Sequence, residues 1–158
     1  MRALHRMLGL GTDCGYESLE PRAMLAADLA VTVDSVSTRF DWLIPGDSIF
    51  VDVTVENVGD APASGQFDLV LQRYLDVEDS GLDDLGSRRY TLNLVPGARA
   101  TFARIAVTVD DAFVPGRYFI AATAEIPTNS ATPIDDEDLD NNTGFSAGTL
   151  DLTYRFGT

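Results

Sequence analysis

Hydrophobic and polar residues alternate along most of the chain after residue 28. The clearest case is the segment 48–57, where one side of an extended chain carries only isoleucine and valine: Ile49, Val51, Val53 and Val55. The residues between them are mostly polar. This period-two alternation with β-branched residues on one side is typical of a half-buried antiparallel strand. We therefore predict that the stretch 44–59, with a turn at each end, forms a central strand of a β-sandwich.

Further strand patterns recur at the ~8–12-residue spacing of all-β sandwiches. The predicted strands are 28–37, 48–57, 65–74, 87–95, 99–109, 116–126 and 145–154, with 76–86 as an acidic loop. The alternation changes sides between Phe102 and Ile105, which predicts a β-bulge. No helical period and no βαβ alternation appears in this region, which excludes nucleotide-binding α/β folds. The pattern thus predicts an all-β sandwich of about seven antiparallel strands.

Three Pro-Gly pairs precede predicted strands, at Pro45-Gly46, Pro96-Gly97 and Pro115-Gly116. Proline sets φ at the first central position of a turn and glycine accepts positive φ at the second, so each pair predicts a type II turn. The pair Asn57 and Gly59 predicts another turn, with asparagine as the local hydrogen-bonding residue and glycine as the positive-φ residue.

Residues 1–27 lack periodicity and are predicted to be a tail, disordered or weakly helical, ahead of a single domain over 28–158. Within the tail, Leu19-Glu20-Pro21-Arg22 and Leu25 resemble the Leu-Glu-Pro-Arg-x-Leu-Leu element near the start of many exported or surface proteins of bacteria, with Met24 replacing one leucine. A short amphipathic helix after Pro21 is an equal alternative. The resemblance implies an extracellular or cell-surface location. The apolar patch Met7–Leu10 is shorter than a signal-peptide core of ~7–15 residues.

The charge balance narrows the classes of partner. The 158 residues contain 25 acids against 11 basic residues, for a net charge of −14, and every basic residue is arginine. Such a surface repels nucleic acids and anionic membranes, so we expect neither as a partner. No apolar run reaches the ~20 residues of a membrane helix, so membrane insertion is not expected. Cys14 is the only cysteine, which excludes an intrachain disulfide.

The region from about residue 28 to 144 resembles a known family, the bacterial cell-adhesion-related domain (CARDB), which is an immunoglobulin-like sandwich. The resemblance is carried, in order, by Ala27-Asp28-Leu29, Pro45-Gly46-Asp47, Val55-Glu56-Asn57-Val58-Gly59, Val95-Pro96-Gly97, Pro115-Gly116-Arg117-Tyr118 and Asp140-Asn141-Asn142. The chain departs from the family in longer loops at 76–84 and 127–138. The resemblance implies an immunoglobulin-like fold, an extracellular setting and no catalysis, and it implies no particular ligand.

The acidic run 135–142 is a candidate Ca²⁺ site, because Ca²⁺ takes six to eight oxygen ligands. The candidate ligands alternate along the run: Asp136, Asp138, Asp140 and Asn142. The run is not an EF-hand loop, since Asn141 stands where glycine is required and Ala147 where glutamate is required. Alternatively, the two asparagines shape a solvated loop by bonding to nearby backbone groups. No other cofactor is predicted.

Two further features add alternatives. The acids of the 76–86 loop, which are Asp76, Glu78, Asp79, Asp83 and Asp84, supply either ligands to the same ion or a solvated loop. Trp42, with Phe40 and either Tyr74 or Tyr90, forms either an aromatic platform for a sugar or a plug at one end of the core.

Catalysis has little support in the residues. His5 is the only histidine and lies in the tail, so a Ser-His-acid or Cys-His arrangement within the domain is excluded. Two functions therefore remain. The first is a non-catalytic structural or adhesive module of a larger surface protein, whose partners are other domains of that protein or another protein. The alternative is a module that binds carbohydrate or a Ca²⁺-dependent ligand through its acidic loops.

Overall fold

The strand with the clearest alternation, β2 (Ser48–Asn57), is the middle strand of a sheet with the order β1-β2-β5, where β1 is Leu29–Thr38 and β5 is Arg99–Thr108. The structure is a computed structural model that describes residues 25–40, 43–75, 82–110 and 114–153. The middle position of β2 in its sheet confirms the predicted central strand.

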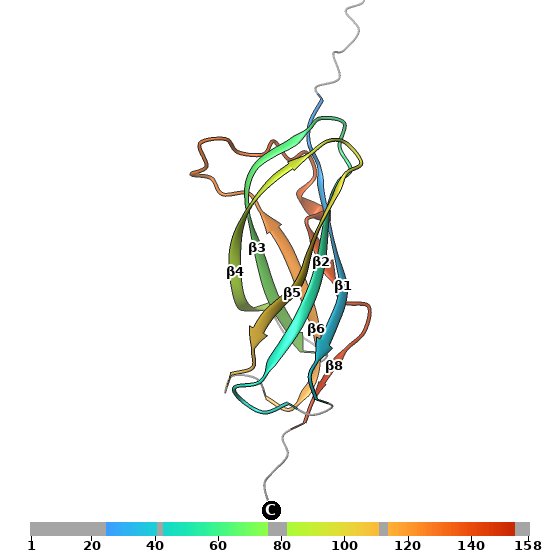
Figure 1. Cartoon of the computed structure of the whole chain (residues 1–158), viewed down its shortest axis with the longest axis vertical. Helices are drawn as coiled ribbons and strands as arrows, with labels where there is room; N and C mark the ends of the chain where they lie inside the picture. Colours follow the sequence, from blue (N-terminus) through green and yellow to red (C-terminus); the bar gives the residue numbers. More distant parts are fainter. Residues whose placement is uncertain (1–24, 41–42, 76–81, 111–113, 154–158) are drawn as a thin grey trace, which may run out of the picture.

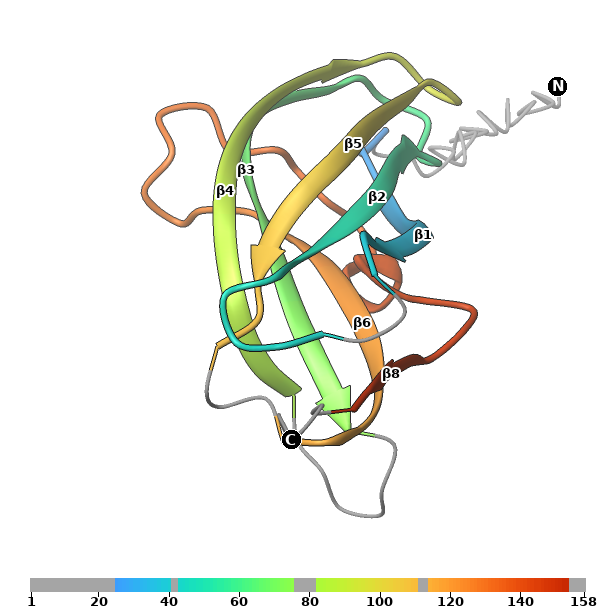
Figure 2. The same cartoon turned by 60° about the horizontal axis from the view of Figure 1, so that its bottom comes forward.

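The second sheet has the order β4-β3-β6-β7, and β8 pairs directly with the first residues of β6, whereas β7 pairs with its later residues. Its strands are β3 (Ala63–Leu75), β4 (Leu82–Leu94), β6 (Gly116–Glu125), β7 (Thr143–Phe145) and β8 (Leu150–Leu152). All pairings within the two sheets are antiparallel. The sheets face each other as two layers (Figures 1 and 2). The immunoglobulin-like β-sandwich is therefore confirmed.

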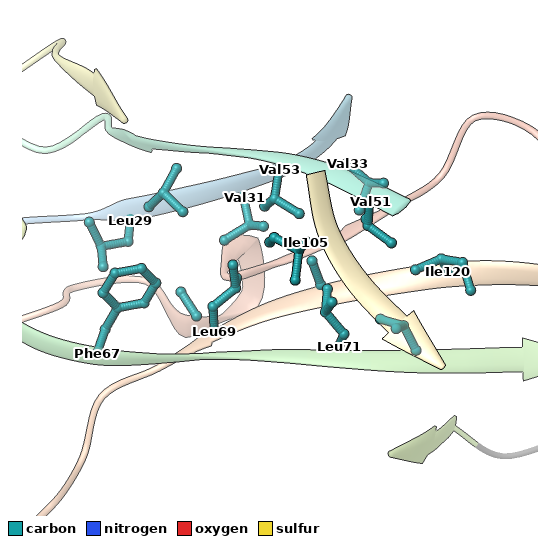
Figure 3. Close-up of a cluster of buried hydrophobic side chains, with 14 of the residues drawn as sticks. Leu29, Val31, Val33, Val51, Val53, Phe67, Leu69, Leu71, Ile105 and Ile120 are labelled. Carbon is teal, nitrogen blue, oxygen red and sulfur yellow. The ribbon is translucent and has the colours of Figure 1, made fainter. Parts of the chain in front are cut away.

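The core lies between the layers and is built from the predicted inward positions. The side chains of Ile49, Val51, Val53 and Val55 are all fully buried, as the alternation in β2 requires. They meet inward residues of the other strands, among them Leu29, Leu69 and Ile120 (Figure 3). Burial of this apolar surface is the main favourable contribution to folding.

Two of the three Pro-Gly turns form as predicted. Gly46 has a φ of 99° and Gly97 a φ of 77°, and the turns are closed by hydrogen bonds from Asp47 N to Ile44 O and from Ala98 N to Val95 O, both 3.0 Å. Gly116 does not have a positive φ among the described residues and instead begins β6, so the prediction of a third type II turn was wrong.

Gly59 also lacks a positive φ, contrary to prediction. Its small size matters instead, because a Cβ there would lie 2.5 Å from Ala26 O and 2.6 Å from Asp28 N. Gly144 in β7 has the same role beside β1, where a Cβ would lie 2.4 Å from Val31 O. Both glycines allow backbones that are distant in the sequence to approach closely.

Two strand boundaries differ from the predictions. β4 begins at Leu82, within the predicted acidic loop, because the β3–β4 ladder continues past an irregularity opposite Leu71 and Gln72. The acids there are not loop residues, since Asp83 pairs with Arg73 and Asp84 accepts a hydrogen bond from Gln72. The predicted strand 145–154 is interrupted after Phe145, and its described part contains the two short strands β7 and β8.

The predicted β-bulge is confirmed. The β2–β5 register shifts opposite Phe102 and Ile105, and Arg104 between them has a φ of 54°, a left-handed conformation uncommon outside glycine. Asp52 stabilises the bulge, because its Oδ1 accepts the Arg104 backbone N–H at 2.6 Å and its Oδ2 accepts the Ser35 hydroxyl at 2.8 Å. These hydrogen bonds, the Arg104 bond first, lower the pKa of Asp52 below its ordinary value of 3.8.

We expect Asp52→Ala to reduce stability at neutral pH by an amount that shrinks as the solution becomes acidic. A carboxyl whose pKa is lowered on folding adds stability above its unfolded pKa, and that stability is lost as the pH falls through the folded pKa. Urea unfolding at several values between about pH 7 and pH 3 measures the difference from the wild type. Asp135→Ala, which removes an exposed carboxylate, is the control. If the difference in free energy of unfolding between Asp52→Ala and the wild type does not change with pH, the expectation is contradicted.

Candidate functional site

A polar cluster lies where the chain enters β1. It consists of Asp28, Asp136, Asn141 and Asn142, and we refer to it as the Asp28–Asp136 cluster. Asn141 Nδ2 donates to Asp28 Oδ1 at 2.8 Å, and Asn142 Nδ2 donates to Asp136 Oδ2 at 3.1 Å. The cluster therefore joins two segments more than a hundred positions apart in the chain, since the Asn141–Asp28 contact spans 113.

The backbone around the cluster explains how these side chains meet. Ala27 and Asp136 form an isolated parallel bridge, and Glu137 N donates to Ala27 O at 2.9 Å. On the other side, Ala124 N donates to Asn142 O at 2.9 Å, which holds the segment against the end of β6. The loop after β6 is thus fixed between β6 and the start of β1.

Asp136 has an unusual environment for a carboxylate. Burial raises the pKa of Asp136, and the negative charge of nearby Asp28 raises it further, while hydrogen bonds from Asn142 and from the Leu29 backbone act in the opposite direction. Among the described residues, no arginine forms an ion pair with either carboxylate of the cluster. The two acids therefore lie near each other without a neutralising cation from the described part of the protein.

The two asparagines of the cluster each retain one unpaired atom. Asn141 Oδ1 and Asn142 Oδ1 are buried and accept no hydrogen bond from the residues that the structure describes. Asn142 as a whole is only 3% exposed. Buried polar atoms without a partner are rare in native proteins, and each one calls for an explanation.

Of the predicted Ca²⁺ ligands, the structure places Asp136 and Asn142 together and gives the other two a different setting. Asp138 precedes a short 3₁₀ helix, η1 (Leu139–Asn141), and its Oδ1 accepts the Asp140 backbone N–H at 3.0 Å. Asp138 and Asp140 are both exposed. Within the described ranges, no group of three or more His, Cys, Asp or Glu side chains has an arrangement suited to a metal ion. Ca²⁺ binding by Asp136, Asp138, Asp140 and Asn142 stays a prediction.

The second predicted group of acids is only partly described. Asp83 and Asp84 belong to β4 and contact Arg73 and Gln72 toward the far end of β3, away from the Asp28–Asp136 cluster (Figure 1). The structure therefore does not bring these two acids to the candidate Ca²⁺ ligands. Asp76, Glu78 and Asp79 lie outside the described residues.

A second candidate site is an aromatic hollow on the outer face of the β3-β6-β7 part of the sheet. It has a volume of about 460 Å³ and is lined by Tyr74, Phe119, Phe145 and Ser146. Tyr74 of β3 is directly opposite Phe119 of β6, and Phe145 of β7 is opposite the fully buried Ala121. Phe145 is 55% exposed. The hollow thus presents aromatic surface to solvent rather than to the core.

The aromatic residues predicted to surround Trp42 lie in separate places. Tyr74 lines the aromatic hollow, and Tyr90 packs against Phe67 and Phe102 at the edge of the core. Phe40 lies in a different depression, beside Arg39 and Phe50. Trp42 itself lies outside the described residues, so neither the sugar platform nor the core plug is tested at that position.

Sequence reasoning missed Phe119 and Phe145 as surface residues. For Phe119 the sequence contained a usable signal, because side chains alternate between the two faces of a strand. Tyr118 and Ile120 take the inward positions of β6, so Phe119 between them points outward. It also missed Asp28 and Asn141 as cluster residues. No local signal joins Asp28 to residues more than a hundred positions later, because that contact depends on how the two sheets pack.

Among the described residues, no helix has the length and apolar content needed to cross a membrane. His5 and Cys14 lie in the undescribed tail.

Comparison with known proteins gives similarities to solved structures only. No family model and no curated protein matches the chain. One similar structure is the CARDB domain of a Pyrococcus furiosus protein in complex with di-metal ions, with 16% identity and a TM-score of 0.49 over 80% of this chain and 94% of that chain. Similarity at 16% identity does not establish the family, and membership in the CARDB family stays a proposal.

Two other similar structures belong to longer proteins. The sporulation control protein of Bacillus subtilis has 17% identity and a TM-score of 0.45, over 80% of this chain and 50% of that one. A β-glucosidase of Listeria innocua in complex with gluconolactone has 15% identity and a TM-score of 0.41, over 71% of this chain and 16% of that one. Similarity at this level identifies neither a ligand nor an activity for the present chain.

Proposed function

We propose that this chain is a non-catalytic, CARDB-like module of an extracellular or cell-surface protein, with a structural or adhesive role carried out by contact with another protein. The observation that carries the proposal is the aromatic hollow formed by Tyr74, Phe119 and Phe145. An exposed apolar patch rimmed by polar residues is typical of a protein contact site, because its burial against a partner removes apolar surface from water.

The surroundings of the hollow favour a protein as the occupant. Its lining is almost entirely apolar, and Ser146 Oγ is already engaged, since it accepts from Ile120 N and donates to Gly148 O. A sugar would need polar groups for its hydroxyls, whereas an apolar side chain of a protein needs none. The net charge of −14 further favours a partner whose contact surface is basic around an apolar centre.

The course of the chain supports a structural role. The described chain enters the sandwich at one end and leaves β8 at the opposite end (Figure 1). A module with its ends at opposite poles can be joined to neighbours in a linear array, where it acts as a spacer. An extracellular location fits the arginine-only acidic surface and the Leu-Glu-Pro-Arg element of the tail.

The proposal predicts a position-specific contact at Phe145. With a photoreactive phenylalanine analogue at position 145, the protein is added to intact cells of the organism that produces it and irradiated. We expect a discrete protein adduct, because the side chain would lie within the contact. Excess unlabelled wild-type protein should suppress the adduct, and the Phe145→Ser variant should compete at least ~10-fold less well, as expected for a central aromatic contact.

The analogue at position 40 is the matched control, since Phe40 is also an exposed aromatic residue but lies in a different depression. An adduct with polysaccharide at position 145 would replace the proposal by the carbohydrate-binding alternative. Equal adducts at both positions, or none at position 145, would overturn it.

A further inference from the structure

A depression at the start of β2 gathers arginine and phenylalanine side chains on a protein with a net charge of −14. We refer to it as the Arg39–Phe50 depression; it has a volume of about 220 Å³ and is lined by Arg39, Phe40, Gly46, Asp47, Ser48 and Phe50. The guanidinium of Arg39 lies 5.7 Å from the centre of the Phe40 ring, and that of Arg104 lies 4.6 Å from the centre of the Phe50 ring. Phe40 is 44% exposed. Two aromatic rings, each with an arginine over it, therefore lie side by side at the surface.

The arginines of this region differ from the other arginines that the structure describes. Four of those others form ion pairs with carboxylates, and they are Arg73, Arg89, Arg99 and Arg117. Within the described ranges, neither Arg39 nor Arg104 forms an ion pair. A third arginine without an ion pair, Arg88, reaches the same region, since it donates to Ala106 O at 3.3 Å and Ala106 is opposite Phe50. Positive charge is thus concentrated here.

The nearest acids of the depression have other partners. Asp47 Oδ2 accepts the Ile44 N–H at 3.0 Å. Asp52 adjoins Arg104, but its two oxygens accept the Arg104 backbone N–H and the Ser35 hydroxyl. The guanidinium groups can therefore accept carboxylates from another molecule.

The exposed part of the acidic run 135–142 has the complementary character. Its exposed acids are Asp135, Glu137, Asp138 and Asp140. Leu139 lies among them and is 67% exposed, the largest fraction of any large hydrophobic side chain in the described part of the chain. The backbone of the run is held by the bridge from Asp136 to Ala27 and by the hydrogen bond from Glu137 N to Ala27 O. The run thus presents one leucine surrounded by carboxylates.

The run and the depression lie at opposite ends of β1. The run contacts Ala27, just ahead of the first residue of β1, whereas Arg39 directly follows its last residue, Thr38. A ten-residue strand is about 30 Å long. The run, which is fixed at one end of β1, therefore cannot enter the depression of its own chain, but it can enter that of a second copy.

We propose that the exposed part of the acidic run of one copy binds in the Arg39–Phe50 depression of a second copy of this chain. Leu139 packs against Phe40 and Phe50, and the carboxylates beside it pair with Arg39 and Arg104. Burial of the leucine and the rings removes apolar surface from water, and arginine binds carboxylates through paired hydrogen bonds. The opposite charges of the two surfaces favour this pairing over contact between two like surfaces.

The contact joins two different surfaces, so each bound copy still offers one surface of each kind. Such a heterologous contact, when repeated, gives a ring or an open chain of molecules. Each copy carries the same net negative charge, but at about 0.15 M salt the screening length of ~8 Å weakens repulsion between distant charges much more than attraction between groups in contact. We expect a small and weak interface, below ~1,200 Å². It uses none of the residues of the aromatic hollow and does not depend on the proposed function.

The test is sedimentation velocity of the whole chain at about 0.15 M NaCl and at protein concentrations up to ~1 mM. We expect the mean sedimentation coefficient to rise with concentration. Arg39→Gln with Arg104→Gln alters the depression, and Leu139→Ser with Glu137→Gln alters the run; each double variant should associate at least ~10-fold more weakly. An equimolar mixture of the two should associate again and stop at a pair, because one variant retains the run and the other retains the depression.

Phe145→Ser is the matched control, since it removes an exposed aromatic residue outside both surfaces, and it should associate as the wild type does. If a double variant does not fold, as judged by circular dichroism, Arg39→Gln or Leu139→Ser alone takes its place, because both residues are exposed. No rise for the wild type at ~1 mM would overturn the proposal. So would association that persists in both folded variants, a mixture that does not associate, or a loss confined to Phe145→Ser, which would assign the contact to the aromatic hollow.

A photoreactive phenylalanine analogue at position 40 gives a second readout in the purified protein. We expect an adduct with twice the mass of the chain, in which position 40 of one copy is linked to residues 135–140 of another. The mass distinguishes this adduct from an adduct with a different protein at position 145. A link from position 40 to any other part of the second copy would contradict the proposal.

Discussion

Replacing Asn57 by alanine is expected to destabilise the domain by about 3 kcal/mol or more, because its side chain satisfies four buried or partly buried backbone groups. Asn57 is fully buried at the end of β2. Its Oδ1 accepts from Asp28 N at 3.3 Å and from Gly59 N at 3.2 Å, and its Nδ2 donates to Ala61 O at 2.8 Å and to Leu94 O at 3.0 Å. Alanine removes all four of these hydrogen bonds.

These contacts give Asn57 a wider role than its own turn. The bond to Asp28 reaches the residue that precedes β1 of the same sheet, and the bond to Leu94 reaches β4 in the facing sheet. Asn57 therefore joins the two layers at the end of the sandwich where the chain enters. The loss of this connection should also loosen the Asp28–Asp136 cluster, of which Asp28 is part.

Urea unfolding of Asn57→Ala measures the effect, and Asn93→Ala is the matched control. Asn93 is an exposed asparagine on β4, and its replacement should change the free energy of unfolding by no more than about 0.5 kcal/mol. If Asn57→Ala lies within about 1 kcal/mol of the wild type, the four hydrogen bonds do not contribute as described.

The second large effect is expected at Phe67, where alanine should cost about 3–5 kcal/mol through lost apolar burial and the cavity left behind. Phe67 is fully buried on β3. Its ring lies 5.9 Å from that of Tyr90 on β4 and 5.7 Å from that of Phe102 on β5, and the last two rings are 4.4 Å apart. The three rings fill the side of the sandwich where β4 and β5 are not hydrogen-bonded to each other.

Urea unfolding of Phe67→Ala measures the loss. Phe40→Ala deletes the same atoms at a position that is 44% exposed, and it should cost much less. Similar losses for the two variants would mean that the aromatic cluster is not a principal part of the core.

Most of the fold could be predicted from the sequence, because it depends on the local alternation of apolar and polar residues. The inward residues of β2 follow directly from isoleucine and valine at every second position. The bulge at Arg104 follows from the change of parity between Phe102 and Ile105. The turns at Gly46 and Gly97 follow from the preference of proline and glycine for fixed and positive φ. Each of these features depends on neighbours within a few residues.

The predictions failed where contacts between distant segments decide the structure. Gly59 was predicted to need a positive φ, yet it needs the absence of a Cβ because Ala26 and Asp28 pass close by. Asp83 and Asp84 were predicted to be loop residues, because the polar side chains of an edge strand resemble those of a loop in sequence. Their inclusion in β4 results from pairing with β3.

The candidate sites show the same division. Composition and spacing were sufficient to single out the acidic run 135–142, because oxygen ligands were numerous there. They could not tell which of its members face one another. The tertiary structure decided that Asp136 and Asn142 meet Asp28 and Asn141, and that Tyr74, Phe119 and Phe145 share one hollow. The physical reason is that alternation along a strand fixes which face a side chain occupies, whereas the packing of two sheets and the register between strands fix which side chain lies beside it.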